Sequence, residues 1–115
     1  MNRLLIIPIL MIAGIVKGYS QTDTTTGVHF DHRLSWQEVL EKAQKENKYI
    51  FVDCYATWCG PCKWMDKNVY QVDSVGTIVN ESFISVRIQM DTSGQDNDKI
   101  KEWYPIARDF EKSIV

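Results

Sequence analysis

The sequence predicts an α/β domain that contains a parallel pair of strands. A dense apolar run over residues 49–55 is typical of a strand. A helical pattern follows, in which Cys62, Met65 and Val69 recur at the spacing of one helix face. Residues 84–90 then alternate between apolar and polar side chains, which is the period of a strand. A strand, a helical crossover and a second strand form a right-handed βαβ unit, so we expect the two strands to be parallel.

The first helix is predicted over residues 35–46. Ser35 and Glu38 have the spacing of a capping box, and Asn47 can end the helix in the left-handed conformation. The strand at residues 49–55 carries too many apolar side chains for a half-exposed strand. We therefore expect it to be a buried central strand of the sheet.

Two shorter helical stretches complete the prediction. Asp73 is expected to cap a helix over residues 73–80. A last helical stripe covers residues 100–110, but Pro105 lies inside it. Because proline removes a helical hydrogen bond and clashes with the preceding turn, we expect a kink or break one or two residues before it.

Residues 1–20 have the organisation of a secretory signal peptide. A positive start at Arg3 precedes an apolar stretch over residues 4–16. That stretch is too short to span a bilayer comfortably, which takes about 20 residues. Small residues before Gln21 fit a cleavage site. We expect an exported protein, periplasmic or secreted, with no stable membrane insertion after cleavage; an uncleaved anchor is the alternative.

The remaining chain is predicted to be one domain. Residues 21–27 are polar and rich in threonine, and we interpret them as a disordered linker. Residues 28–115 form the domain, with a short edge strand expected at residues 28–30. The formal net charge of −2 argues against nucleic acid or an anionic membrane as a partner.

The stretch over residues 58–63 reads Trp-Cys-Gly-Pro-Cys-Lys, where the strand gives way to the helix. Two cysteines with this spacing are a redox signature. Helix positions three apart have β-carbons about 5 to 6 Å apart, so Cys59 and Cys62 can form a disulfide with little backbone movement. Pro61 occupies the first turn, where a missing N–H costs nothing, and Gly60 lets a partner backbone approach closely.

This motif resembles that of the thioredoxins residue for residue, over residues 49–70. Asp53 falls where that family keeps a buried acid. The resemblance implies a thioredoxin-like fold in which Cys59, at a helix N-terminus, is the nucleophile that attacks a substrate disulfide. Cys62 would resolve the mixed disulfide, and Asp53 is the candidate base for its thiol, since burial makes a carboxylate a better proton acceptor. Trp58 resembles the tryptophan with which the family contacts its partners.

Gly60, Pro61 and Lys63 complete the expected substrate-contacting and supporting set around the cysteine pair. The resemblance implies no cofactor besides a redox-active disulfide, and no metal. The expected partners are substrate proteins with disulfides. An exported reducing-type motif also needs electrons from elsewhere, which implies a thiol donor protein, membrane-bound or periplasmic.

Several alternatives stay open at this point. A structural zinc site could recruit His29 and His32, although zinc does not need the Gly-Pro insert. The pair could form a merely structural disulfide, or deliver a metal through Cys59 and Cys62. The scaffold could also serve as a non-catalytic binding or chaperone-like module. Covalent haem attachment would need a histidine at the position of Lys63.

The third cysteine, Cys54, has no partner in this scheme. Free cysteine is among the most buried residue types, so we interpret Cys54 as a small buried hydrophobe, with a regulatory thiol as the alternative.

Thioredoxins place a cis-proline opposite the cysteine pair, in a loop that leads to an antiparallel hairpin and a final helix. The three prolines here are Pro8, Pro61 and Pro105, and none fits that position. We therefore expect an incomplete thioredoxin-like fold, its N-terminal βαβαβα portion, and a fragment of a longer protein. Such a piece would leave sheet edges unpaired and would be poorly folded and weakly active.

Overall fold

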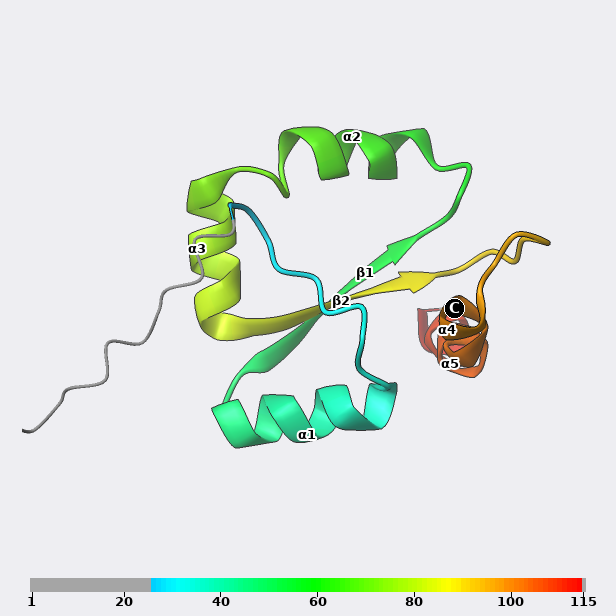
Figure 1. Ribbon diagram of the computed structural model, residues 1–115, viewed down its shortest axis with the longest axis horizontal. Coiled ribbons are helices and arrows are strands. Elements are labelled where there is room, and N and C mark those ends of the chain that lie inside the picture. The colour runs from blue at the N-terminus through cyan, green and yellow to red at the C-terminus, as the bar shows by residue number, and fades with distance from the viewer. Residues whose placement is uncertain (1–25, 115) are drawn as a thin grey trace, which may run out of the picture.

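The computed structural model describes residues 26–114 as an arrangement of two strands and five helices (Figure 1). In chain order the elements are α1 (Trp36–Glu46), β1 (Tyr49–Tyr55), α2 (Gly60–Asn68), α3 (Asp73–Ser82), β2 (Phe83–Gln89), α4 (Asp98–Glu102) and α5 (Tyr104–Ile114). The predicted signal peptide and most of the predicted linker lie outside the described residues. Among the helices that are described, none is long and apolar enough to cross a membrane.

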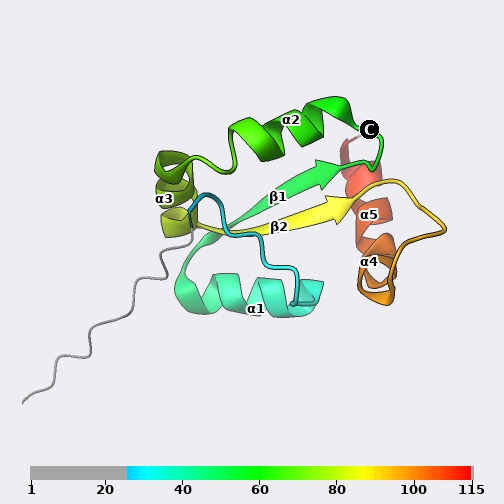
Figure 2. The ribbon, with the colours of Figure 1, turned by 45° about the horizontal axis from the view of Figure 1, so that its top comes forward.

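The two strands are parallel, as the βαβ pattern predicts. Their register pairs Tyr49 with Phe83 at one end and Tyr55 with Gln89 at the other. Helices α2 and α1 lie on opposite faces of this sheet (Figure 2). Helix α3 lies near the end where β2 begins, and α4 and α5 lie beyond the end where both strands finish (Figure 2). The cysteine motif follows β1 directly and therefore lies at this second end.

The prediction that residues 49–55 form a buried central strand is wrong, because this strand is neither fully buried nor in the middle of the sheet. Tyr49 is 78% exposed and most of β1 is only partly buried. Within residues 26–114, β1 pairs only with β2, whereas β2 also forms a parallel bridge from Ser85 to Phe30 on its other side. The middle position therefore belongs to β2, in which Val86 and Ile88 are fully buried. Phe30 also confirms, as a single bridge, the edge strand expected at residues 28–30.

Helix α1 begins and ends as its sequence predicts. The Ser35 hydroxyl accepts from the Glu38 amide at 3.4 Å, and the Glu38 carboxylate accepts from the Ser35 amide at 2.7 Å. Asn47 ends the helix at φ 51°. One stripe of α1 packs against β2 and forms the core, which contains Val39, Ala43, Ile84 and Val86.

Of two other predicted helix boundaries, one is wrong and one is correct. Asp73 is the first helical residue of α3, and the cap is Val72, which makes no side-chain capping bond. The predicted break before Pro105 is confirmed, because α4 ends at Glu102 and α5 begins at Tyr104. The ring of Trp36 then meets two aromatic rings from this region, Trp103 and Phe110.

The ordered part of the domain begins before Val28. Gly27, which the sequence assigned to the end of the linker, is buried and has φ +82°. Its carbonyl accepts from the Asn80 side chain at 3.0 Å, and the Val28 amide donates to the Tyr70 carbonyl at 2.7 Å. A β-carbon at Gly76 of α3 would lie 2.2 Å from the Gly27 carbonyl oxygen. Because neither glycine has a side chain, the backbone of the N-terminal segment can pass in direct contact with the backbone of α3.

Replacing Gly76 by alanine is expected to destabilise the fold by about 1–3 kcal/mol, because the new methyl group would overlap backbone atoms that cannot rotate away. Urea unfolding followed by circular dichroism measures the change. Ser74→Ala, at an exposed position of the same helix, is the matched control and should change stability by no more than about 0.5 kcal/mol. Equal stability of the two variants would contradict the close crossing.

Candidate functional site

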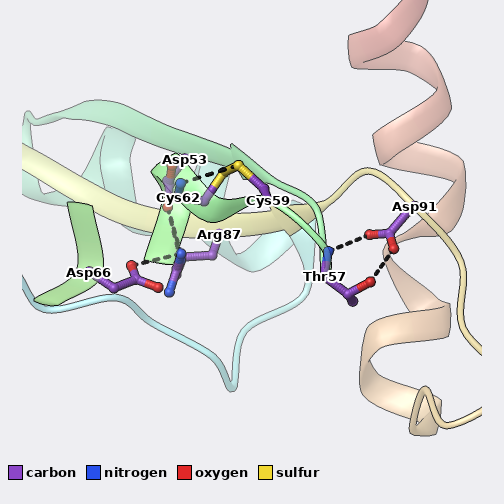
Figure 3. Close-up of a disulfide and its surroundings, with 7 residues drawn as sticks. All are labelled: Asp53, Thr57, Cys59, Cys62, Asp66, Arg87 and Asp91. Atoms are coloured by element: carbon purple, nitrogen blue, oxygen red, sulfur yellow. Dashed lines mark hydrogen bonds and ion pairs between the residues drawn. A yellow bond between two sulfur atoms is a disulfide. The ribbon is translucent and has the colours of Figure 1, made fainter. Parts of the chain in front are cut away.

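The cysteine motif forms the junction between β1 and α2. Cys59 is the N-cap of α2 in an extended conformation, and its amide donates to the Ala56 carbonyl at 3.1 Å. Cys59 and Cys62 form a disulfide across 5.3 Å between their α-carbons (Figure 3). The pairing that the spacing allowed is therefore present in the structure.

The first turn of α2 directs a backbone donor at Cys59. The Cys62 amide donates to the Cys59 sulfur at 3.2 Å, and Pro61 occupies the first turn. Amides at a helix N-terminus and the helix dipole favour an anion at this position. Once the disulfide is reduced, the same arrangement favours a thiolate on Cys59, which is the nucleophilic form of cysteine.

Aromatic and basic residues flank the two cysteines in the sequence. Trp58 is 78% exposed and Trp64 is 59% exposed, while Lys63 is also exposed. A β-carbon built at Gly60 would meet no atom within 4 Å, so nothing described in this chain requires glycine there. This openness is consistent with the close approach of another molecule.

The two cysteines are both half-buried, so residue exposure alone does not separate the expected attacker from the expected resolving thiol. Their positions do separate them: Cys59 caps the helix, whereas Cys62 lies inside the first turn. Only Cys59 receives the amide bond described above.

Asp53 points toward the same region from β1 (Figure 3). Its side chain is 15% exposed, and its Oδ2 accepts from the Arg87 Nε at 2.9 Å and lies 2.9 Å from Arg87 Nη2. Within residues 26–114, no direct hydrogen bond joins Asp53 to either cysteine. A proton that passes from Cys62 to Asp53 therefore needs a bridging water or a movement of these side chains after reduction.

Arg87 is the residue that sequence reasoning missed. It stands opposite Asp53 in the β1–β2 register and also bonds Asp66 of α2 through Nη2 at 2.8 Å. The guanidinium lies 4.7 Å from the Tyr55 ring centre and 5.1 Å from the Phe30 ring centre. The available signal was one basic residue among the polar positions of an alternating strand, but a strand register across a long crossover cannot be read from sequence.

Tyr70 lies at the border of the same network. Burial raises the pKa of the Tyr70 hydroxyl, and the charge of Asp53 and a hydrogen bond to it raise that pKa further. Tyr70 is therefore a neutral hydrogen-bond donor near neutral pH.

Asp91 holds the loop before the cysteines. Its carboxylate accepts from the Thr57 hydroxyl and from the Thr57 amide, the latter at 2.9 Å (Figure 3). These two hydrogen bonds, that of the hydroxyl first, lower the pKa of Asp91 below its ordinary value. These contacts form a tether between the end of β2 and the cysteine motif.

Acid is expected to weaken this tether. Because the folded-state pKa of Asp91 is depressed, its contribution to stability is complete above the unfolded value of about 3.9 and is lost as pH falls through the folded value. The urea midpoint of Asp91→Asn should therefore depend less on pH between about 5 and 2 than that of the wild type. Asp109→Asn, at an exposed site of α5, should keep the wild-type dependence. Parallel curves for all three proteins would contradict the tether.

Two neighbouring acids lie in the turn after β2 and at the start of α4. Asp96 is buried and accepts from the Ser93 amide at 2.7 Å and from the Gln89 side chain at 2.9 Å. Asp98 lies in the first turn of α4, whose cap is Asn97. In the part of the chain that the structure describes, no group of three histidine, cysteine or acidic side chains could hold a metal ion. The zinc alternative, with His29 and His32, gains no support from this arrangement.

Cys54 corrects another prediction, because it is exposed and not a buried hydrophobe. It faces away from Asp53 on β1, which is an edge strand among the described residues, and so receives little cover. Partial desolvation raises the pKa of the Cys54 thiol, and the charge of Asp53 raises it further. Cys54 is therefore protonated near neutral pH and is a poor nucleophile.

Comparison with known proteins gives a consistent result. A family model described as thioredoxin-like matches residues 32–109, more than half of the chain, which confirms the predicted α/β fold class. Thioredoxin H7 of Arabidopsis thaliana is 30% identical over 67 residues, which cover 58% of this chain and 52% of that protein. The H-type thioredoxin of Chlamydomonas reinhardtii is 52% identical over 33 residues, 29% of each chain.

A longer relative matches as well. Spermatogenesis-associated protein 20 of Rattus norvegicus is 33% identical over 76 residues, which cover 63% of this chain but only 10% of that protein. The chain thus spans about a tenth of the rat relative and about half of the plant relative. No solved structure matches the chain significantly.

Proposed function

Because the chain belongs to the thioredoxin-like family, we propose that it is a thiol–disulfide oxidoreductase that reduces protein disulfides outside the cytoplasm. The observation that carries this proposal is the Cys62 amide directed at the Cys59 sulfur at a helix N-terminus. That geometry favours a thiolate on one cysteine and places a second cysteine within bonding distance of it. A structural disulfide has no need of a backbone amide directed at one of its sulfurs at a helix N-terminus.

The reaction begins from the reduced pair. The Cys59 thiolate attacks one sulfur of a substrate disulfide, forms a mixed disulfide and releases the other substrate sulfur as a thiolate, which takes a proton from water. Cys62 then loses its proton, with Asp53 as the acceptor, and attacks the Cys59 sulfur. The intramolecular disulfide forms, the second substrate thiolate leaves and is protonated, and two electrons have passed to the substrate.

The surroundings of the pair support a protein substrate. Trp58, which precedes Cys59, is exposed and offers an apolar contact next to the motif, and open space at Gly60 allows a backbone to approach. Trp64 and Lys63 of α2 are exposed as well. Re-reduction of the pair requires a thiol donor protein, and the signal peptide predicted over residues 1–20 suggests that donor and substrates meet the chain outside the cytoplasm.

Replacing Cys62 by serine is expected to trap the mixed disulfide, because the captured substrate can no longer be released by the second thiol. The reduced full chain is incubated with a disulfide-bonded protein such as insulin, quenched with acid, and analysed without reductant. A covalent adduct should form with Cys62→Ser and not with wild type, and dithiothreitol should release it by reducing the mixed disulfide. Cys54→Ser, which retains both motif cysteines, should behave like wild type.

The same experiment tests the leading alternative. If Cys62→Ser captures no substrate, and wild type and both variants bind the same proteins equally, the scaffold is a binding module and not an oxidoreductase. Binding of one zinc or copper ion by the reduced wild type in competition with a chelator, without adduct formation, would instead favour metal delivery.

A further inference from the structure

Asp66 has no role in the exchange mechanism, yet it bonds the residue that holds Asp53. Arg87 Nη2 lies 2.9 Å from Asp53 Oδ2 and 2.8 Å from Asp66 Oδ1 (Figure 3). One guanidinium nitrogen therefore serves two carboxylates, one from β1 and one from the helix that carries the cysteines. The two carboxylate oxygens can be no farther apart than the sum of these distances.

The shared contact lies in a partly buried environment, where electrostatic interactions are stronger than at an exposed surface. Arg87 is 19% exposed and Asp53 is 15% exposed, whereas Asp66 is 37% exposed. The guanidinium lies near the rings of Tyr55 and Phe30, which limits its freedom to follow one carboxylate when the other changes. A partly buried ion pair is screened less by solvent and salt than an exposed one.

The local charge count is unbalanced. One positive group faces two negative groups, so the two carboxylates share a single cation. The charged and titratable groups near Asp53 are Arg87 of β2, Asp66 of α2, Tyr70 after α2 and Tyr55 of β1, while Cys54 of β1 lies on the opposite face of the strand. Among these, Asp66 is the one that competes with Asp53 for the cation.

We propose that Asp66 is a positioning residue of the exchange site, which acts through Arg87 to keep the Asp53 carboxylate ready to accept the proton of Cys62. This inference rests on the proposed function for its meaning in catalysis. It requires that a change at Asp66 alters Asp53 through Arg87, and this effect can be measured without catalytic turnover.

Asp66→Asn is expected to free Arg87 for Asp53, so that Asp53 takes up a proton less readily. In the oxidised full chain, the carboxyl carbon resonance of Asp53 should titrate at a lower pH than in the wild type. The matched control is Glu102→Gln, which also removes one acidic partner of an ion pair, the 3.0 Å contact with Lys99, at a distant surface. It should leave the Asp53 midpoint in place.

A second background separates an effect through Arg87 from a direct effect of charge. With Arg87→Met, the further change Asp66→Asn should shift the Asp53 midpoint much less than it does in the wild type. If Arg87→Met does not fold, Arg87→Gln takes its place, because glutamine keeps a polar side chain but carries no charge that the two carboxylates could share. An undiminished shift in these backgrounds would overturn the role of Arg87, and an unmoved midpoint in Asp66→Asn alone would overturn the proposal.

The kinetic readout should follow the titration. The rate of release of a substrate trapped on Cys59, measured against pH, should shift in Asp66→Asn in the same direction as the Asp53 midpoint, with substrate capture by Cys59 unchanged. A chain that shows the titration shift but exchanges no disulfide would contradict the proposed function and leave the effect through Arg87 standing.

Discussion

Replacing Cys59 by serine is expected to abolish disulfide exchange. A hydroxyl at this position is not ionised near neutral pH, so the helix N-terminus and the Cys62 amide have no anion to stabilise. Loss of a covalent nucleophile removes the whole pathway, and we expect turnover to fall by at least about 10⁴-fold, on the scale of other nucleophile deletions. Insulin reduction with dithiothreitol as the electron donor measures this loss.

The control for this result is Cys54→Ser. Cys54 is exposed and its thiol is protonated near neutral pH, so its removal should leave turnover within about twofold of the wild type. A residual turnover of Cys59→Ser close to that of the wild type would show that another cysteine attacks the substrate. The assignment of Cys59 as nucleophile would then be wrong.

Replacing Arg87 by methionine is expected to cause the largest loss of stability among the single substitutions at the site. It would leave Asp53 partly buried without its cation, and removing one partner of a buried ion pair costs about 3–5 kcal/mol. Because Asp53 and Arg87 keep 15% and 19% exposure, we discount that range to about 2–3 kcal/mol. The thermal midpoint should fall by about 8 to 20 °C for a domain of this size.

The matched comparison is Lys99→Met, which breaks the exposed pair between Lys99 and Glu102. Such surface pairs are worth about 0–1 kcal/mol, so this variant should melt close to the wild type. Adding Asp53→Asn to Arg87→Met should recover part of the lost stability, because the unpaired charge disappears with the carboxylate. If the double variant were as unstable as the sum of the single variants, the ion pair would not be the cause.

The sequence by itself determined the local features of this protein. The capping box at Ser35, the helix end at Asn47 and the break before Pro105 all follow from interactions within a few residues of the chain. The cysteine pair belongs to the same class, because the spacing of Cys59 and Cys62 on one helical turn sets their separation. The thioredoxin resemblance over this stretch then agreed with the family match.

Tertiary structure alone decided which distant side chains meet. The contacts of Arg87 with Asp53 and Asp66 depend on the register of two strands joined through a long helical crossover, and the bond between Asp91 and Thr57 depends on where both strands end. Burial on β1 was misjudged for a related reason. Apolar composition shows that a strand can be buried, but its place in the sheet decides whether Cys54 is covered, and no local pattern encodes that place.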